Sequence, residues 1–202
     1  MTRVLTIGPG APIPEMLSDA AHTLWDGGLV AFPTESFYGL GGHALDPRAL
    51  ARVFAIKGRP ESKPLLVLVD GPAMVETLAI DISTGARDLM NRHWPGALTV
   101  VLKAMTDLPA ALTAGTGTIG VRMPGHPVAR GLTRAAGFPI TAPSANPSGQ
   151  PPPCTASAVR DYFMGQVDLI LDGGPTEGGA GSTVADCTAW PPRVLRQGPI
   201  HL

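Results

Sequence analysis

Short apolar runs of strand length recur along this chain, and the spacing between them limits how the chain can fold. They occupy residues 29–32, 65–69, 98–102, 119–123, 140–142 and 167–171, with a weaker run at 194–195. Several connections between these runs are too short to hold the crossover helix that joins two parallel strands. The pattern therefore predicts an α/β fold with a mixed parallel and antiparallel sheet flanked by helices.

Segments with apolar residues at helical spacing lie between these runs. Residues 14–25 form the first predicted helix, which ends before the glycine pair at 27–28. Asp46 followed by Pro47 is a cap and first-turn pair, and it opens a second helix. Two more helices are predicted, one around residues 86–90 and one over 126–136.

Composition narrows the class of protein. The chain has 202 residues, 44% hydrophobic and 15% charged, which suits one folded domain with a proper core. Lys and Arg number 15 against 16 acidic residues, a balance that disfavours indiscriminate nucleic-acid binding but permits a local basic pocket. Cys154 and Cys187 lack metal-ligand spacing and indicate reduced thiols. With no signal-peptide pattern and no membrane-length apolar run, we expect a cytoplasmic protein.

Lys57 and Arg59 follow a predicted helix and precede an apolar strand. If the backbone there is extended, positions i and i+2 face the same way, and two cations can meet one anionic group. Lysine offers a compact charge, and arginine a planar fork suited to phosphate oxygens. Such a pair taken alone is more often a solvated surface pair, so it indicates a phosphate site only in combination with other motifs.

Ser144 and Asn146 also stand two positions apart, between Pro143 and Pro147, which stiffen the backbone. Their hydroxyl and amide groups can donate to a phosphate or to the edge of a nucleobase. A rigid turn held by local side-chain hydrogen bonds explains the same residues equally well. The sequence leaves both interpretations open.

Arg122 ends a predicted strand just before Pro124. An arginine in such a buried place needs an anionic partner, which is either an internal carboxylate or a ligand, and both stay open. Ser182 and Arg196 are likewise polar residues among apolar strand positions.

Residues 32–42 form a predicted strand that runs into a glycine-rich turn, where backbone N–H groups can approach a ligand closely. The segment matches neither the GK[ST] phosphate loop nor the GxGxxG dinucleotide loop. GxSxG and HExxH motifs are also lacking, and the histidines show no metal-ligand spacing. These features favour catalysis by positioning and by electrostatic stabilisation of phosphates.

Taken together and in order, these segments resemble the YrdC/TsaC family of threonylcarbamoyl-AMP synthases. The matching pieces are FPTESFYGLG, KGRPESKPLLVLV, WPGALTVVL, TIGVRMPGHP, APSANPSG, LDGG with GSTVAD, and RVLRQGPI. They cover most of residues 29–200, and the ordered set is far more specific than any single piece. The resemblance implies a YrdC-like twisted open sheet with a positively lined concave cavity, in a short form with a single domain over residues 1–202.

The resemblance also implies which residues act. Its catalytic tetrad corresponds to Lys57, Arg59, Ser144 and Asn146. ATP contacts are implied for these four and for Glu61, Thr118 and Arg196. Positions implied to hold L-threonine are Thr34, Arg122 and Ser182, with Arg122 paired to the carboxylate of the amino acid.

The implied reaction begins with the amine of L-threonine, which combines with bicarbonate or CO2 to give N-carboxythreonine. The new carboxylate then attacks the α-phosphorus of ATP, and pyrophosphate leaves. Mg²⁺ is expected with the ATP phosphates and not in a protein metal site. The product would serve tRNA modification by separate threonylcarbamoyl-transferase proteins, with at most a weak contact to tRNA and none to a membrane.

Some residues depart from the family pattern. Ser36 stands where threonine is common, and Lys63 and Leu68 replace residues that are often Asn or Asp and His. Loss of that histidine leaves one ligand contact of the family open, though not the tetrad. Two alternative functions also stay open. One is a YrdC-like RNA-binding module without synthase activity, and the other is a carbamoyl-adenylating enzyme that uses carbamoyl phosphate.

Overall fold

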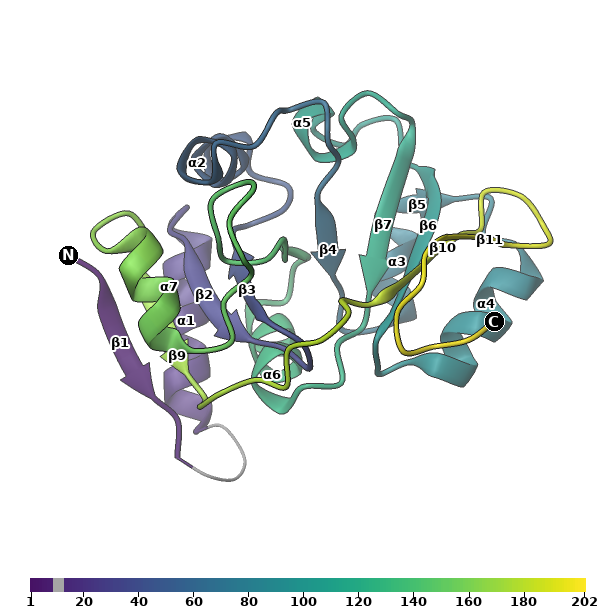
Figure 1. The fold of residues 1–202 in the computed structure, drawn as a ribbon. Helices are drawn as coiled ribbons and strands as arrows, with labels where there is room; N and C mark the ends of the chain where they lie inside the picture. Colours follow the sequence, from purple (N-terminus) through teal and green to yellow (C-terminus); the bar gives the residue numbers. More distant parts are fainter. Residues whose placement is uncertain (9–12) are drawn as a thin grey trace.

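Two β-sheets form the centre of the molecule in the computed structural model, which describes residues 1–8 and 13–202 (Figure 1). The four-stranded sheet holds, in spatial order, β1 (Arg3–Thr6), β9 (Leu169–Asp172), β2 (Val30–Pro33) and β3 (Tyr38–Gly41). The seven-stranded sheet holds β11 (Arg193–Arg196), β10 (Thr183–Asp186), β6 (Leu98–Ala104), β7 (Thr118–Arg122), β4 (Leu66–Leu68) and β8 (Ile140–Thr141), with β5 (Ala79–Ile80) paired to β6.

Both sheets mix parallel and antiparallel pairs, as predicted. Strands β1 and β2 run parallel to β9, β6 runs parallel to β10, and β4 runs parallel to β7. The pairs β2–β3, β6–β7, β4–β8 and β10–β11 are antiparallel. The division into two sheets was not predicted. Isolated bridges from Gly39 to Ser144 and from His43 to Ile140 connect them between β3 and β8.

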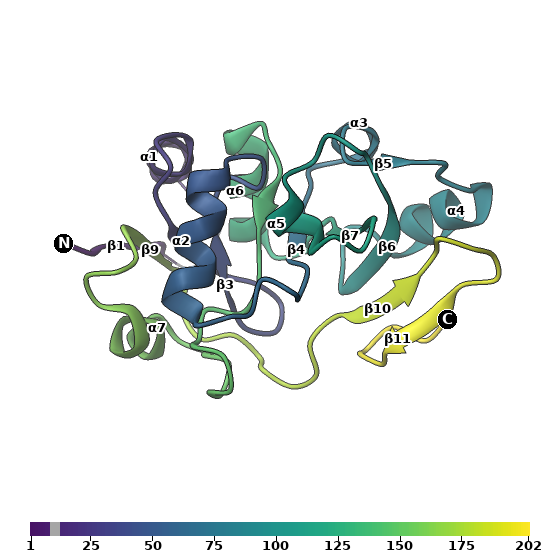
Figure 2. The ribbon, with the colours of Figure 1, turned by 90° about the horizontal axis from the view of Figure 1, so that it is seen from above.

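Helices cover these sheets on opposite sides. They are α1 (Pro14–Trp25), α2 (Pro47–Lys57), α3 (Pro72–Glu76), α4 (Thr84–His93), α5 (Ala110–Thr113), α6 (Pro127–Ala136) and α7 (Ala156–Phe163). Seen from above, α1, α6, α3 and α4 follow one long side of the molecule, and α7, β10 and β11 lie along the other (Figure 2). No helix in the described ranges is long and apolar enough to cross a membrane.

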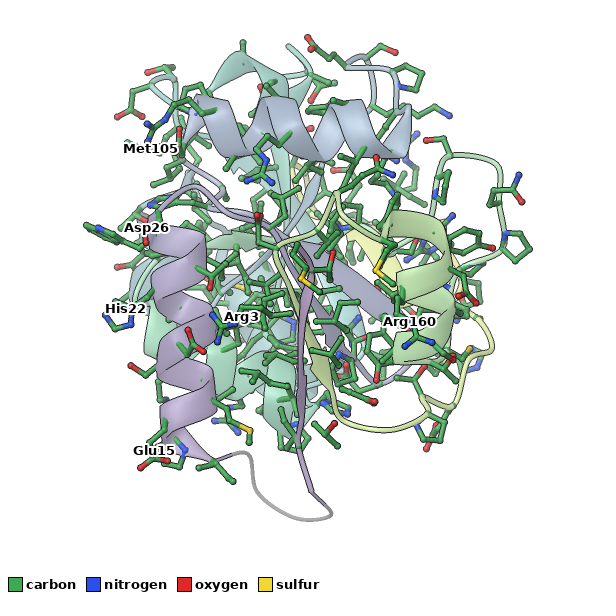
Figure 3. All side chains as sticks on the ribbon, turned by 90° about the vertical axis from the view of Figure 1, so that its left-hand side faces the viewer. Arg3, Glu15, His22, Asp26, Met105 and Arg160 are labelled. Atoms are coloured by element: carbon green, nitrogen blue, oxygen red, sulfur yellow. The ribbon has the colours of Figure 1, made fainter. Side chains whose placement is uncertain are left out.

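Successive side chains of a strand point to opposite faces of the sheet, so neighbouring strand residues contact different helices. On β9, Leu169 and Leu171 pack in a cluster with α1 and α6, whereas Ile170 between them packs in a second cluster with α7. Figure 3 shows the same arrangement from the N-terminal side, with α1 and α7 on either side of β1. Arg3 on β1 forms an exposed ion pair with Asp19 of α1, a contact of small energetic weight.

Glycines and caps end the helices where the sequence predicts. The Asp46 carboxylate accepts a hydrogen bond of 2.9 Å from the Arg48 N–H and caps α2. Gly58 then closes α2 in the left-handed region at φ 54°, and Gly137 closes α6 at φ 72°. The turn at Gly58 directs the chain from α2 toward the site described below.

All predicted strands and helices are present, with ends shifted by up to three residues. The glycine-rich turn predicted within residues 32–42 is wrong in part, because its second half is β3. Gly39 and Gly41 have low strand propensity, but they lie under the Phe32 ring, where a Cβ on Gly41 would come within 2.8 Å of a ring carbon. Strand β1 and helix α7 were missed for want of a strong pattern.

Candidate active site

A cavity of about 490 Å³ opens on the seven-stranded sheet, on the face opposite the one that packs against α4. Its size suits a small-molecule ligand. Alternate strand residues form its floor: Leu66, Gly120 and Val101 share one row of the register, and Leu68 pairs with Arg122 beside it. The residues between them, such as Val100 and Val121, point into the core.

Loops complete the walls of the cavity. Residues 34–39 and 142–144 meet at the bridge between Gly39 and Ser144. The connection from β9 to β10 crosses the front of the molecule in Figure 1, and its Gly178 N–H donates to the Ser36 carbonyl at 2.7 Å. Among the described lining residues are three arginines, Arg59, Arg122 and Arg196, and no Asp or Glu.

Arg59 is held by main-chain oxygens. Its Nε and Nη2 donate to the carbonyls of Lys63 and Pro64 at 3.3 and 2.9 Å. Burial lowers the pKa of Arg59, yet an arginine remains charged at any working pH. Carbonyl oxygens orient the guanidinium but do not neutralise it, so this charge is available to an anion.

Lys57 lies behind the cavity wall. It is the last residue of α2 and 3% exposed, and its Nζ donates to the carbonyls of Ser144 and Asn146 at 2.5 and 2.6 Å. Its own carbonyl accepts from the Ser148 N–H at 2.7 Å. Burial, and secondarily the charge of Arg59, lowers the pKa of Lys57 to about 8. The prediction of an extended 57–59 segment is therefore wrong, because a helix end and a left-handed glycine separate the two cations.

Ser144 and Asn146 also lie in different places relative to the cavity. Ser144 lines the cavity, whereas Asn146 is 7% exposed and donates from Nδ2 to the carbonyls of Pro147 and Gln150 at 2.9 and 2.7 Å. The two interpretations that the sequence left open thus apply to different residues. Ser144 faces the cavity, and Asn146 fixes the turn.

The opposite end of the cavity contains Thr34, Ser182 and Arg122, all buried. Thr34 Oγ1 donates to the Phe37 carbonyl at 2.7 Å, and the Ser182 and Thr99 hydroxyls are 2.7 Å apart. These short polar side chains are held in place by the loops and strands around them.

Arg196 reaches this end from β11. Its Nε and Nη2 donate to the Ser182 carbonyl at 3.0 and 2.8 Å. Burial, and then the positive charge of Arg122, lowers the pKa of Arg196. Two guanidinium groups thus lie near each other in one cavity, an arrangement that favours an anionic ligand.

Arg122 has an internal carboxylate as its partner. Its Nε donates to the Gly96 carbonyl at 2.8 Å, and its Nη2 lies 2.5 Å from Oε2 of Glu35. Glu35 was missed in the sequence, although an acidic residue between a buried strand and a glycine-rich segment was a usable signal.

The remaining predicted residues fall inside and outside the cavity. Thr118 lines it, as do Ser36 and Leu68, the residues that depart from the family pattern. Glu61 and Lys63 are exposed and do not line it. Within the described ranges, no group of three or more His, Cys, Asp or Glu residues could hold a metal ion.

A protein-family model for Sua5, YciO and YrdC, described as telomere recombination, matches residues 22–198. The chain belongs to the Sua5/YciO/YrdC family. This membership confirms the family indicated by the sequence motifs, and the mixed α/β architecture confirms the fold class.

Relatives within the Sua5/YciO/YrdC family include two proteins named threonylcarbamoyl-AMP synthase. The one from Pyrococcus abyssi is 46% identical over 91% of this chain and 54% of its own length, and the one from Bacillus subtilis is 43% identical over the same shares. The chain thus spans about half the length of these relatives. A crystal structure of P. abyssi Sua5 complexed with L-threonine superposes with a TM-score of 0.90 at 42% identity, covering 97% of this chain and 57% of that one.

Proposed function

We propose that this chain forms threonylcarbamoyl-AMP and pyrophosphate from L-threonine, bicarbonate or CO2, and ATP. The observation that carries the proposal is a single cavity with two different cationic ends. Arg59 and Ser144 line one wall, and Arg122 with Thr34 and Ser182 lines the other. The names of the relatives and the threonine complex of P. abyssi Sua5 support the same reaction.

ATP occupies the wall that carries Arg59, Ser144 and Thr118, and its phosphates extend along the cavity to Arg196, which lies beside Ser182. These arginines neutralise triphosphate charge and the charge that develops on the leaving pyrophosphate. Apolar floor residues such as Leu66 and Val101 offer surface to the uncharged parts of the nucleotide. Glu61, exposed outside the cavity lining, is at most a peripheral contact.

L-Threonine occupies the other end, with its carboxylate on Arg122 and its polar groups near Thr34 and Ser182. Its amine nitrogen bonds to the carbon of CO2 and loses a proton, which gives the carbamate of N-carboxythreonine. A carbamate oxygen then bonds to the α-phosphorus as the bond to the bridging oxygen breaks, and pyrophosphate leaves with that electron pair. The substrate supplies the nucleophile, so the chain acts by binding, orientation and charge stabilisation.

Lys57 and Asn146 serve this reaction indirectly. Both lie behind the wall and hold the 143–149 loop through main-chain oxygens, which places Ser144 at the cavity. Mg²⁺ enters with ATP as part of the substrate. Because no Asp or Glu is among the described lining residues, phosphate oxygens and water would coordinate it.

The proposal also covers the setting of the reaction. Residues 1–202 act as one domain in the cytoplasm, where ATP is abundant. Separate threonylcarbamoyl-transferase proteins take the product to tRNA, and tRNA itself makes at most a weak contact with this chain.

Pyrophosphate release tests the proposal. Purified protein is incubated with MgATP and bicarbonate, with and without L-threonine, and the products are analysed by mass spectrometry. Threonine-dependent release together with a threonylcarbamoyl-AMP peak is expected. If folded protein releases no pyrophosphate, the proposal fails, and carbamoyl phosphate as a substrate and salt-resistant RNA binding are then measured as the two alternatives.

A further inference from the structure

The ion pair between Arg122 and Glu35 stands out among the contacts of the cavity. Arg122 is 4% exposed, and its guanidinium has five N–H groups in a rigid fork. Nε is used by the Gly96 carbonyl, and Nη2 lies beside the Glu35 carboxylate. Within the described ranges, Nη1 makes no hydrogen bond, whereas the buried Nη2 faces the Glu35 carboxylate. The outer end of the fork therefore has N–H groups left for a ligand.

Glu35 is itself firmly held. Its Oε1 accepts from the Gly125 N–H at 2.5 Å, just beyond the strand that carries Arg122. A Cβ on Gly125 would lie 3.0 Å from that oxygen and 3.5 Å from Gly96 Cα, so Gly125 packs closely against both groups. Glu35 and Gly96 thus bracket the guanidinium and define its plane.

The charge of Glu35 is maintained in this setting. Burial acts to raise the pKa of Glu35, but the charge of Arg122 and the Gly125 hydrogen bond outweigh it, and the pKa is lowered. Glu35 is therefore ionised at neutral pH. Arg122 is the one cavity arginine with a carboxylate partner among the described residues, since Arg59 and Arg196 donate only to carbonyl and hydroxyl oxygens.

We propose that Glu35 is a positioning and selectivity residue for the amino-acid substrate. It fixes the plane of the Arg122 guanidinium so that the outer N–H groups receive the α-carboxylate, and its negative charge offsets that of Arg122, so that phosphate groups bind Arg59 and the neighbouring Arg196 instead. This inference rests on the proposed function. It assigns to Glu35 the difference between Arg122, which receives a monoanionic carboxylate, and Arg59 and Arg196, which receive the polyanion.

Glu35→Gln tests the proposal, because it removes the charge and keeps the shape. L-Threonine binding, measured by calorimetry without turnover, is expected to weaken about tenfold or more, in line with the loss of a charged hydrogen-bond partner. In turnover, KM for threonine should rise while kcat and KM for ATP change less than threefold. Pyrophosphate should become a competitive inhibitor against threonine, an effect that loosened packing alone would not produce.

Glu35→Asp keeps the charge at a shorter reach and should recover part of the binding without the new inhibition. It also serves as the test if Glu35→Gln does not fold, as judged by its thermal unfolding. Glu15→Gln, an exposed carboxylate on α1, is the matched control and should behave as the unaltered chain.

Unchanged or tighter threonine binding in Glu35→Gln would overturn the inference. It would mean that the Glu35 carboxylate does not contribute to binding or competes with the substrate carboxylate for Arg122. That result would leave the proposed function intact. Failure of the unaltered chain to bind L-threonine would instead overturn both.

Discussion

The two ends of the cavity use the same residue type in different electrostatic settings. Among the described residues, Arg59 at one end donates only to carbonyl oxygens, whereas Arg122 at the other end lies against a carboxylate. An arginine without an internal carboxylate partner attracts a polyanion such as a triphosphate. A compensated arginine with free N–H groups favours a single planar carboxylate. Charge compensation, more than the number of arginines, distinguishes the arginine proposed for the amino acid from those proposed for the nucleotide.

Replacing Arg59 should give the largest effect and separate the two ends most clearly. Arg59→Ala removes a phosphate-facing cation and should lower kcat/KM for ATP by about 10² or more. L-Threonine binding in the absence of ATP should change little, because Arg122 is untouched. Steady-state kinetics and calorimetry measure the two effects, with Arg160→Ala on the outer side of α7 as the control. Equal losses in both assays would contradict the division.

The lowered pKa of Lys57 should appear in the pH dependence of stability. The pKa of Lys57 is about 8 in the folded chain, against an ordinary value of 10.5 in the unfolded chain. Between pH 8 and 10.5, the unfolded chain therefore binds this proton more tightly than the folded chain does. The free energy of unfolding should therefore rise from pH 8 to 10.5, by at most about 3 kcal/mol from this group, and this gain is lost as the pH falls through 8.

Denaturant unfolding across this pH range measures the effect, and Lys57→Met should lack it. The comparison with Lys57→Met is needed because burial raises the pKa of Cys187 to about 11, which gives an opposite trend. A parallel pH dependence in both proteins would show that Lys57 is not an uncompensated cation.

Ser144→Ala should have a moderate effect confined to the nucleotide end. Loss of one hydroxyl donor at the cavity wall is expected to lower kcat/KM for ATP about tenfold, with threonine binding preserved. Ser18→Ala, on the exposed face of α1, is the control. Weakened threonine binding in Ser144→Ala would mean that the two ends overlap.

Gly58→Ala should have the smallest effect and act through the backbone. Among the described residues, nothing lies within 4 Å of a Cβ at this position, so the cost is the left-handed conformation at φ 54°, about 1 kcal/mol of stability. Because the turn places Arg59, KM for ATP should rise slightly and KM for threonine should not. Thermal unfolding and kinetics check both, and an equal rise in the two KM values would contradict a local effect.

Much of the fold and part of the site could be predicted from local signals. Apolar runs and caps predicted the main strands and helices, because burial and capping act over a few neighbouring residues. Strand β3 was not predicted, since Gly39 and Gly41 become strand residues only by pairing with β2 under the Phe32 ring. Such pairing joins segments whose interaction has no signature in either one.

For the site, the sequence by itself determined the chemical inventory: cations at 57, 59, 122 and 196, small polar groups at 34, 144 and 182, and the order of the motifs. Only the tertiary structure decided which of them meet. Lys57 lies behind the cavity wall and donates to the carbonyls of Ser144 and Asn146, and Glu35 contacts Arg122, which is 87 positions away in the sequence. The physical reason is that a charge depends on its neighbours in space, and strand register and loop closure choose those neighbours.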